Sequence, residues 1–321
     1  MPLFVLRRLL SFVLTLLATS VVVFAVLELL PGNAAQVILG ETATPESIAA
    51  MEDKLGLNQP AAARYLNWMG GMLQGQTGLS ISYDTPTAQL MAERMQVTLP
   101  LAVMAMGLTV ALALALGLYA ASQQNKAGDV GVMTLSQLGL ALPNFWLAIL
   151  LILLFAVHLE WVSAGGFPGW SEDDGGGVGE GIKALLLPAM ALAAVQTAIL
   201  TRVTRSAVLD TLREDFVRNA RAKGLSRRQV LWGHVLRNAM IPVLTVMGLQ
   251  FGNLITSAIV IENVFVLPGI GRLIFQAIAN RDLIVVRDVV MLLSALVILI
   301  NFCIDVLYAW IDPRLKAGHA E

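Results

Sequence analysis

The sequence predicts an all-α polytopic membrane protein with six transmembrane helices. Of its 321 residues, 57% are hydrophobic and only 13% are charged, and the mean hydropathy is +0.75. An average soluble domain carries about twice that share of charged residues. The apolar residues are also gathered into runs of the length that a helix needs to cross a bilayer, which is about 20 residues. We therefore expect a single transmembrane domain over residues 1–321.

Six apolar runs give the expected spans. Arg7 and Arg8 precede the first run, which is longer than the apolar region of a signal peptide and lacks a small-residue cleavage site, so we expect a retained transmembrane helix. The paired arginines also resemble a twin-arginine signal, but the run is too long for one. The expected spans are 9–30, 99–121, 130–157, 184–206, 240–261 and 289–310.

Three polar intervals on one side of the membrane connect these spans. The interval 33–97 is expected to hold three short helices, the first capped by Thr44 and closed at Gly56, the third at about 86–95. The Gly-rich interval 158–183 is expected to be an irregular loop. In the interval 262–288, the sequence Pro-Gly-Ile-Gly at 268–271 should break the chain before another short helix at 272–280.

The interval 207–239 is the main polar loop on the other side. Nine of the 21 Lys and Arg residues lie between positions 202 and 242. Gly224 suits the left-handed position that ends a helix, and Ser226 with Gln229 matches a capping box that begins the next one. We expect a helix over 207–223, a tight turn and a second helix, with apolar residues at helical spacing that dock against protein. A basic loop held by lipid head groups is the alternative.

The distribution of cations predicts the orientation. With the N-terminus inside, the inner side carries fourteen Lys and Arg residues, and the outer side carries four when the long interval 33–97 is set aside. Cytoplasmic loops are enriched in Lys and Arg, and long loops cross the membrane regardless of charge. We therefore expect both termini and the 207–239 loop in the cytoplasm, and the intervals 33–97 and 262–288 outside.

No group of residues is typical of an enzyme. The stretch 176–183 superficially resembles a phosphate-binding loop but lacks the Gly-Lys-Ser/Thr ending. The three histidines and the single Cys303 lie in distant segments without the spacing of metal ligands. We expect no catalytic residue, no metal site, no cofactor and no nucleic-acid partner for this chain.

Polar side chains inside the apolar spans are candidates for a solute pathway, because each requires a partner or a watery cavity in the membrane. Interhelical hydrogen bonding is the alternative for each of them. Asp305, in the last span, is expected to form a structural network with Asn301. The pathway candidates are Gln137, Asn144, Gln196, Gln250, Asn253, Thr256 and Ser257.

The central loop resembles the cytoplasmic loop of ABC-importer permeases. The resemblance is carried by FVRNARAKGL at 216–225 and HVLRNAMIP at 234–242. In such permeases this loop contains the EAA motif and lies in a cleft of the ATPase subunit. The glutamate of the motif would fall on Arg218 here, with Glu214 and Asp215, one turn earlier, as alternatives. The resemblance assigns ATPase coupling to Glu214, Asp215, Arg218, Ala220, Arg221, Ala222, Lys223 and Gly224.

Further blocks extend the resemblance over nearly the whole chain. ENVFVLPGIGRL at 262–273, NRD at 280–282 and DPR at 312–314 resemble dipeptide, oligopeptide and glutathione permeases. The resemblance implies the type I ABC-importer (MetI-like) fold in a bacterial inner membrane. It also implies a second homologous permease, two ATPase subunits that hold ATP and Mg, and an external solute-binding protein as partners beside membrane lipid.

We expect the interval after the fifth span to close the outer side of the pathway. The residues of this outer gate would be Glu262, Pro268, Gly269, Gly271 and Arg272, with Glu262 paired to Arg272 or Arg281. Peptide is the expected cargo, with glutathione, nickel chelates and sugars as alternatives from similar permeases. An ion-coupled secondary transporter and a membrane anchor are the rival functions, although no mid-membrane acid or base of a proton relay is evident.

Overall fold

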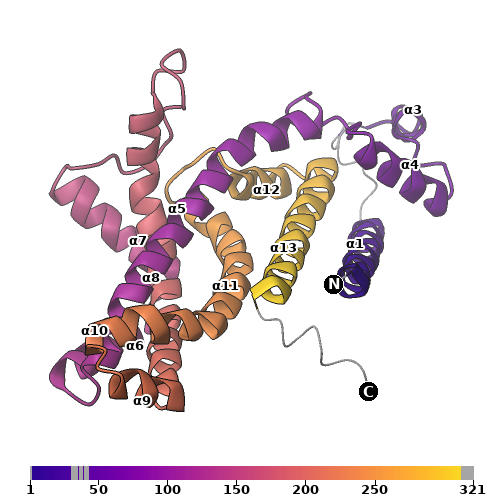
Figure 1. The fold of residues 1–321 in the computed structure, drawn as a ribbon. Coiled ribbons are helices and arrows are strands. Elements are labelled where there is room, and N and C mark those ends of the chain that lie inside the picture. The colour runs from indigo at the N-terminus through magenta and orange to yellow at the C-terminus, as the bar shows by residue number, and fades with distance from the viewer. Residues whose placement is uncertain (1, 30–34, 36–38, 40–42, 312–321) are drawn as a thin grey trace.

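The computed structural model describes residues 2–311 except 30–34, 36–38 and 40–42, and these described residues form a helical protein (Figure 1). The only β feature among them is one isolated bridge between Leu79 and Pro86. The predicted all-α class is confirmed. The helices are α1 Pro2–Leu29, α3 Pro45–Leu55, α4 Ala61–Leu73, α5 Thr87–Ser122, α6 Ala127–Ala141, α7 Asn144–Leu151, α8 Val178–Thr211, α9 Asp215–Ala222, α10 Arg227–Val230, α11 Leu236–Val264, α12 Ile270–Ala279 and α13 Leu283–Ile311, with π-helical segments at Ile152–His158 and Leu231–Val235.

Five helical stretches of the described chain are long and apolar enough to cross a membrane. They are Leu6–Leu29, Thr87–Ser122, Val178–Thr211, Arg228–Val264 and Leu283–Val306. A sixth crossing exists only if α6 and the helix that continues from α7 to His158 count as one span, because they meet at an angle of 102°. The expected continuous span 130–157 is therefore wrong in shape.

Pro143 explains this break. Proline has no N–H to donate to the preceding helical turn and disfavours the helical conformation of the residue before it. Leu142 accordingly has φ −93° and ψ 127°, an extended conformation, and α7 begins at Asn144 directly after Pro143. Hydropathy alone does not predict this break, because the residues on both sides of Pro143 are mostly apolar.

Some helices begin earlier in the chain than the apolar runs predict, and α5 is the main example. The short helix expected at 86–95 is the beginning of α5, which continues without a break to Ser122. By contrast, α3 begins and ends as expected: the Thr44 hydroxyl and Ser47 form a capping box, and Gly56 has φ +67°. Long helices thus extend beyond the apolar runs by several turns, since polar residues continue a helix once it has been nucleated.

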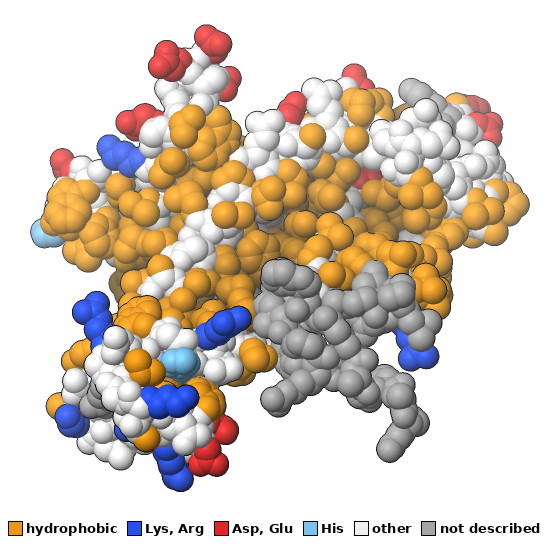
Figure 2. Space-filling model, viewed as in Figure 1, with side chains coloured by type: hydrophobic (Ala, Val, Ile, Leu, Met, Phe, Trp, Pro, Cys, Tyr) orange, Lys and Arg blue, Asp and Glu red, His pale blue; other side chains and the backbone are white. Residues whose placement is uncertain are grey.

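The core lies where α5, α8 and α11 cross (Figure 1). In the apolar part of α8, 67% of the residues are buried, compared with 6% in α1, which lies at the edge against α13. Close approach of α5 and α8 depends on Gly117, where an added Cβ would lie 2.6 Å from Cβ of Thr204. Figure 2 shows an apolar band across the molecule, with mainly Lys and Arg beside some acidic side chains at the α9 end and mainly Asp and Glu at the opposite end.

Candidate coupling surface and membrane pathway

The helix α9 projects at one end of the molecule and is anchored there by two small apolar side chains (Figure 1). Val217 and Ala220 are buried in an apolar cluster that also contains Val208, Val230 and Val235. This cluster joins α9 to α8 and to the helix that leads into α11. The other residues of α9 are exposed, so the helix presents a polar surface outward on a rigid apolar base.

This surface contains most of the residues expected to couple to an ATPase. Glu214 precedes α9 in an extended conformation and is exposed. Arg218 lies 3.5 Å from Asp215, and both side chains are more than three-quarters exposed, so the pair contributes little to stability. Ala220 is the exception, because its side chain faces the core. The exposed members are Glu214, Asp215, Arg218, Arg221, Ala222, Lys223 and Gly224.

The turn after α9 has the predicted local structure. Gly224 has φ +86°, a left-handed conformation that a β-branched residue rarely adopts. The capping box is also present: the Ser226 amide donates to Oε1 of Gln229 at 2.9 Å, and the Gln229 amide donates to the Ser226 hydroxyl at 3.3 Å. These two predictions are confirmed.

The single helix expected over 207–223 is wrong, because the chain turns between α8 and α9. α8 ends at Thr211, and α9 begins at Asp215. The turn places Val208 of α8 and Val217 of α9 in the same apolar cluster. A straight helix would bury only one of these faces, so packing overrides the helical propensity of the intervening residues.

A charged contact links α8 to the first turn of α6. Nε and Nη2 of Arg205 donate to the two carboxylate oxygens of Asp129 at 2.5 and 2.6 Å. The Asp129 carboxylate also accepts the amide of Asn125 at 2.9 Å. Bidentate pairing of this kind fixes geometry as well as charge. This pair could not be predicted from the sequence, because the two residues lie 76 positions apart along the chain.

The structure divides the pathway candidates into two groups. Gln196 of α8 and Gln250 of α11 are buried, and Nε2 of Gln250 donates to the Gln196 carbonyl at 3.1 Å. Their side-chain oxygens have no partner among the described residues, and the same is true of Oδ1 of half-buried Asn144. The two glutamines thus join α8 to α11.

The second group lies on surface that the described chain leaves open. Asn253 and Thr256 are exposed on α11, in a stripe with Leu249 and Val260 at helical spacing. Thr256 donates weakly to the Gly252 carbonyl at 3.4 Å. Ser257 is half-buried beside this stripe. Gln137 is also exposed, but it lies on α6 and therefore does not belong to the stripe on α11.

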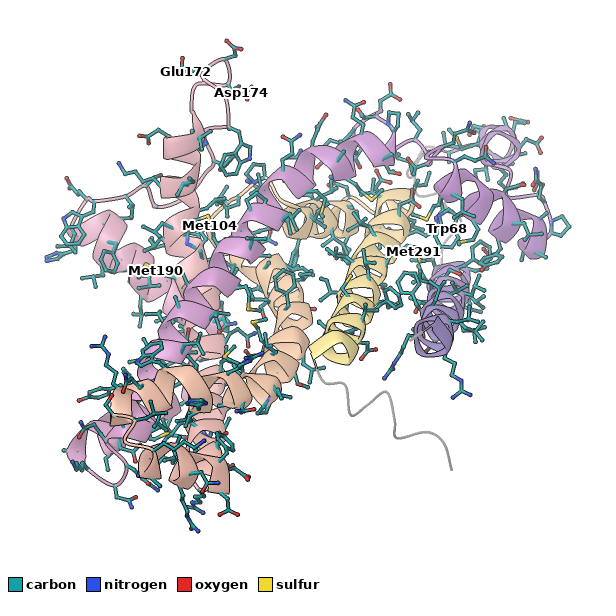
Figure 3. The ribbon with its side chains drawn as sticks, viewed as in Figure 1. Trp68, Met104, Glu172, Asp174, Met190 and Met291 are labelled. Carbon is teal, nitrogen blue, oxygen red and sulfur yellow. The ribbon has the colours of Figure 1, made fainter. Side chains whose placement is uncertain are left out.

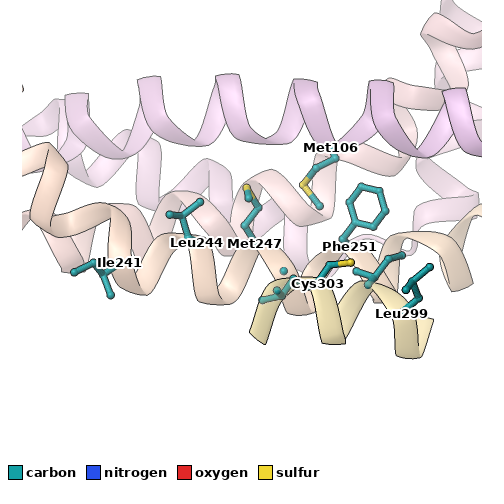
Figure 4. A pocket seen from close by; sticks show the side chains of 10 residues that line it. Met106, Ile241, Leu244, Met247, Phe251, Leu299 and Cys303 are labelled. Carbon is teal, nitrogen blue, oxygen red and sulfur yellow. The ribbon is translucent and has the colours of Figure 1, made fainter. Parts of the chain in front are cut away.

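An apolar cavity of about 340 Å³ opens between α5, α11 and α13 (Figure 4). Its walls include Met106, Met247, Phe251 and Leu299, and Cys303 is exposed into it from α13. Asp305, two residues after Cys303 on α13, lies 3.1 Å from Arg8 of α1. The structure therefore connects Asp305 to the first helix by an ion pair, which the expected network with Asn301 did not anticipate.

Glu262 is completely buried at the end of α11 and holds the beginning of α12. Its Oε1 accepts the hydroxyl of Thr98 at 2.6 Å, and its Oε2 accepts the amide of Gly271 at 2.6 Å. The Thr98 oxygen in turn accepts the amide of Ile270 at 2.9 Å. Two of the free amides at the N-terminus of α12 are thereby satisfied by α11 and α5.

The expected ion pair of Glu262 with Arg272 or Arg281 is wrong. Nη1 of Arg272 donates to the carbonyl of Val266 at 2.9 Å, and the described residues place no cation within ion-pair distance of Glu262. The carboxylate is enclosed so tightly that an added Cβ at Gly269 would overlap it. The sequence Pro268-Gly269-Ile270-Gly271 therefore provides the room that this buried carboxylate needs.

Two more buried carboxylates at the start of α13 were not recognised in the sequence. Oδ2 of Asp282 accepts the Ser80 hydroxyl at 2.6 Å and the amide of Ile81 at 2.9 Å. Asp288 accepts the indole N–H of Trp68 at 2.8 Å and the Thr87 hydroxyl at 2.5 Å. These contacts hold α4 and the start of α5 against α13. Of these residues, Asp282 lies in a block, NRD at 280–282, that carries the family resemblance in the sequence.

Comparison with known proteins identifies the family. Residues 113–317 match the family described as "Binding-protein-dependent transport system inner membrane component", and residues 1–112 match its N-terminal companion. The chain is 40% identical to the glutathione transport system permease protein of Salmonella choleraesuis, over 98% of each chain. It is 37% identical to the dipeptide permease of Alkalihalophilus pseudofirmus, over 98% of this chain and 99% of that one. It is also 37% identical to the di/tripeptide permease of Pseudomonas aeruginosa, over 98% of each.

Solved structures agree on the fold. A structure of the MetNI methionine ABC transporter in an inward-facing conformation matches with a TM-score of 0.56 at 17% identity, over 70% of this chain and 97% of that one. An amino acid ABC transporter matches with a TM-score of 0.51 at 14% identity, over 68% and 93%. At these identities the likeness shows the fold alone, and it confirms the predicted type I importer architecture. With its apolar crossing helices, the chain is a multi-pass inner-membrane protein that belongs to the family of binding-protein-dependent transport system inner membrane components.

Proposed function

We propose that this chain forms half of the membrane pathway of an ATP-driven importer whose cargo is peptides. The observation that carries the proposal is its identity of 37% over nearly the whole length to permeases named for dipeptides and di/tripeptides. Glutathione is the second candidate cargo, favoured by the 40% identity to a glutathione permease. ATP hydrolysis would take place on two partner ATPase subunits, while a second permease and a solute-binding protein complete the assembly.

In this proposal α9 transmits force between the ATPase and the membrane helices. Its exposed residues would lie in the ATPase cleft, while buried Val217 and Ala220 carry displacement into the core. Exposed Glu214 and Asp215 remain the two candidates for the acidic role that Arg218 cannot supply. Because Asp129 holds Arg205 at the foot of α8, displacement of α9 would also move the α5–α6 turn.

The proposed pathway follows the open stripe of α11. Asn253 and Thr256 would face the solute, with Ser257 beside them and with Leu249 and Val260 toward the second permease. Gln196 and Gln250 would instead hold α8 to α11, and their free oxygens are open to water when the helices separate. Gln137 and Asn144 stay weaker candidates because they lie on α6 and α7, outside this stripe.

The outer gate would be the segment from Glu262 to α12. Glu262 and Thr98 connect three helices there, and Pro268, Gly269 and Gly271 allow the sharp re-entry. Arg272 stabilises the preceding turn through the Val266 carbonyl. In the proposed orientation both termini and α9 are cytoplasmic and this gate is external.

Reconstitution tests the proposal directly. This chain is expressed with a second permease, the ATPases and the solute-binding protein of the importer, purified as a complex and placed in proteoliposomes. We expect uptake of a labelled dipeptide that requires ATP and the binding protein. Uptake of glutathione alone would establish the second cargo, whereas uptake driven by an ion gradient without ATP would refute an ATP-driven importer.

A further inference from the structure

The helix α4 has an apolar face that the described protein covers only in part. Trp68 is buried, and Tyr65 and Met72 are partly buried beside it. Ala62, Leu66 and Leu73 continue this face at helical spacing but remain open, with Leu66 67% and Leu73 84% exposed. The opposite side carries Asn67, whose amide donates to Oε1 of Gln59 at 3.1 Å. α4 is thus amphipathic, with an apolar face wider than its protein contact.

The covered part of this face lies against α1 and α13. The Tyr65 hydroxyl and the Ser20 hydroxyl are 2.7 Å apart, and the ring of Phe24 packs edge-on against Tyr65 with centroids 5.5 Å apart. Arg64 of α4 forms an ion pair with Glu28 near the end of α1. On the other side, Trp68 packs beside Met291 of α13 (Figure 3).

These contacts fix the depth of α4 relative to the membrane. Arg8 and Glu28 are the charged residues that bound the apolar part of α1, and a helix with a rise of 1.5 Å per residue separates them by about 30 Å. This equals the thickness of the hydrocarbon core of a bilayer, roughly 30 Å. Glu28, and the Arg64 that pairs with it, therefore mark one boundary of the core, while Ser20 and Phe24 lie inside it, in the leaflet opposite α9.

The helix α1, against which α4 packs, has further exposed apolar surface. α1 is exposed along most of its length, including Val21, Val22 and Val26 at the level of α4. A helix at this depth with an apolar face toward the core and a polar face outward has the form of an interfacial helix. We propose that α4 lies in the membrane interface and inserts Ala62, Leu66 and Leu73 among the acyl chains of the leaflet opposite α9.

This placement gives the lipid surface a structural role. Trp68 donates to the buried Asp288 at 2.8 Å, and the guanidinium of Arg287 lies 4.8 Å from the centre of the Trp68 ring. The depth of α4 in the leaflet therefore determines the position of the start of α13. The inference rests on the membrane placement of the chain and is independent of its cargo, so it stands or falls separately from peptide import.

Site-directed spin labelling in the whole importer tests the inference. Replacing Cys303, the single cysteine of the chain, by Ala gives a cysteine-free background. Nitroxide labels are then attached to Ala62→Cys, Leu66→Cys and Leu73→Cys, with Asn67→Cys as the matched control on the opposite face. The complex is placed in nanodiscs of phosphatidylcholine and phosphatidylglycerol, and collision with O₂, which concentrates in hydrocarbon, is compared with collision with a water-soluble nickel chelate.

We expect the labels at 62, 66 and 73 to collide several-fold more with O₂ than with the chelate, and the label at 67 to show the reverse. If all four sites favour the chelate, α4 lies in water and the inference is overturned. Shielding of the labels at 62, 66 and 73 from both reagents would mean that the second permease covers this face, which overturns the inference. If the labels are shielded only when the solute-binding protein is present, the face is a docking surface for that protein, and the inference is also overturned.

Discussion

At the scale of single residues, Glu262 determines how the chain re-enters the fold after α11. Its two oxygens accept from Thr98 of α5 and from Gly271 at the start of α12, and no water-exposed surface remains on its side chain. A buried donor or acceptor that loses its only partner costs about 1–3 kcal/mol. The contact therefore joins α5, the end of α11 and the start of α12 with few residues.

Glu262→Gln should lower the stability of this junction. A glutamine side chain has only one acceptor oxygen, so either the Thr98 hydroxyl or the Gly271 amide loses its acceptor, at a cost of about 1–3 kcal/mol. We expect a lower melting temperature of the purified complex and, if the junction closes the outer gate, raised ATP hydrolysis without substrate. Glu93→Gln is the control, because exposed Glu93 only accepts from Gln89 on the same helix. Equal melting and hydrolysis for the two variants would contradict both roles.

The limits of sequence analysis are visible at this site. The two glycines and Pro268 were recognised as a structural break, because their backbone requirements are local. The partner of Glu262 was assigned to a nearby arginine, since charge complementarity is the only pairing rule that a single sequence offers. The true partner, Thr98, lies 164 positions earlier in the chain and is neutral. Its contact depends on how α5 packs against α11, which the sequence does not reveal.

At the scale of elements, predictions based on backbone chemistry were more reliable than those based on hydropathy. Gly224, the Ser226 capping box and the Thr44 cap are each decided by a few adjacent residues, and each was confirmed. The straight span 130–157 and the helix 207–223 were wrong, because apolar periodicity continues through both breaks. The first break could have been predicted from Pro143, because proline interrupts helical hydrogen bonding. The second depends on burial of Val217 in a cluster assembled from distant segments.

Gly224→Val should weaken the transmission of conformational changes between the ATPase and the membrane helices. A β-branched residue at φ +86° is strained by about 1–3 kcal/mol, and the chain can relieve this strain by changing the angle between α9 and α10. The apolar spans are untouched, so we expect normal complex yield. Uptake and substrate-stimulated ATP hydrolysis, measured in the reconstituted importer, should both fall severalfold.

Gly224→Asn is the matched control for this variant. Asparagine adopts the left-handed conformation more readily than other non-glycine residues. Among the described atoms, none lies within 4 Å of a Cβ added at Gly224, so the asparagine side chain meets open space. Near-normal coupling with asparagine and loss with valine would assign the effect to the backbone. Normal coupling with both would show that Gly224 merely joins two helices.

At the scale of the whole molecule, the two ends of the protein differ in their balance of basic and acidic side chains. Figure 2 shows Lys and Arg around α9 and α10, and acidic side chains on the loop at the opposite end, where Figure 3 labels Glu172 and Asp174. This difference follows from the sequence order of basic and acidic intervals between the apolar runs. The orientation that it predicts, with α9 in the cytoplasm, is a property of the assembled membrane protein and requires a direct test.

Thiol labelling of intact cells provides that test in the cysteine-free Cys303→Ala background. Glu172→Cys, at the exposed tip of the loop between α7 and α8, should react with a membrane-impermeant maleimide in intact cells. The reason is that Lys- and Arg-rich loops are retained in the cytoplasm, which leaves the loop at the end opposite the basic α9 region outside. Gln124→Cys in the α5–α6 turn and Ala222→Cys on α9 are equally exposed and should react only after the inner membrane is opened. Two inner sites are needed, because an ATPase bound to α9 can shield position 222 from the maleimide. Position 124 should still react once the inner membrane is opened. Reaction of 124 and 222 in intact cells, with 172 protected, would invert the protein and place α9 beyond the reach of any cytoplasmic ATPase.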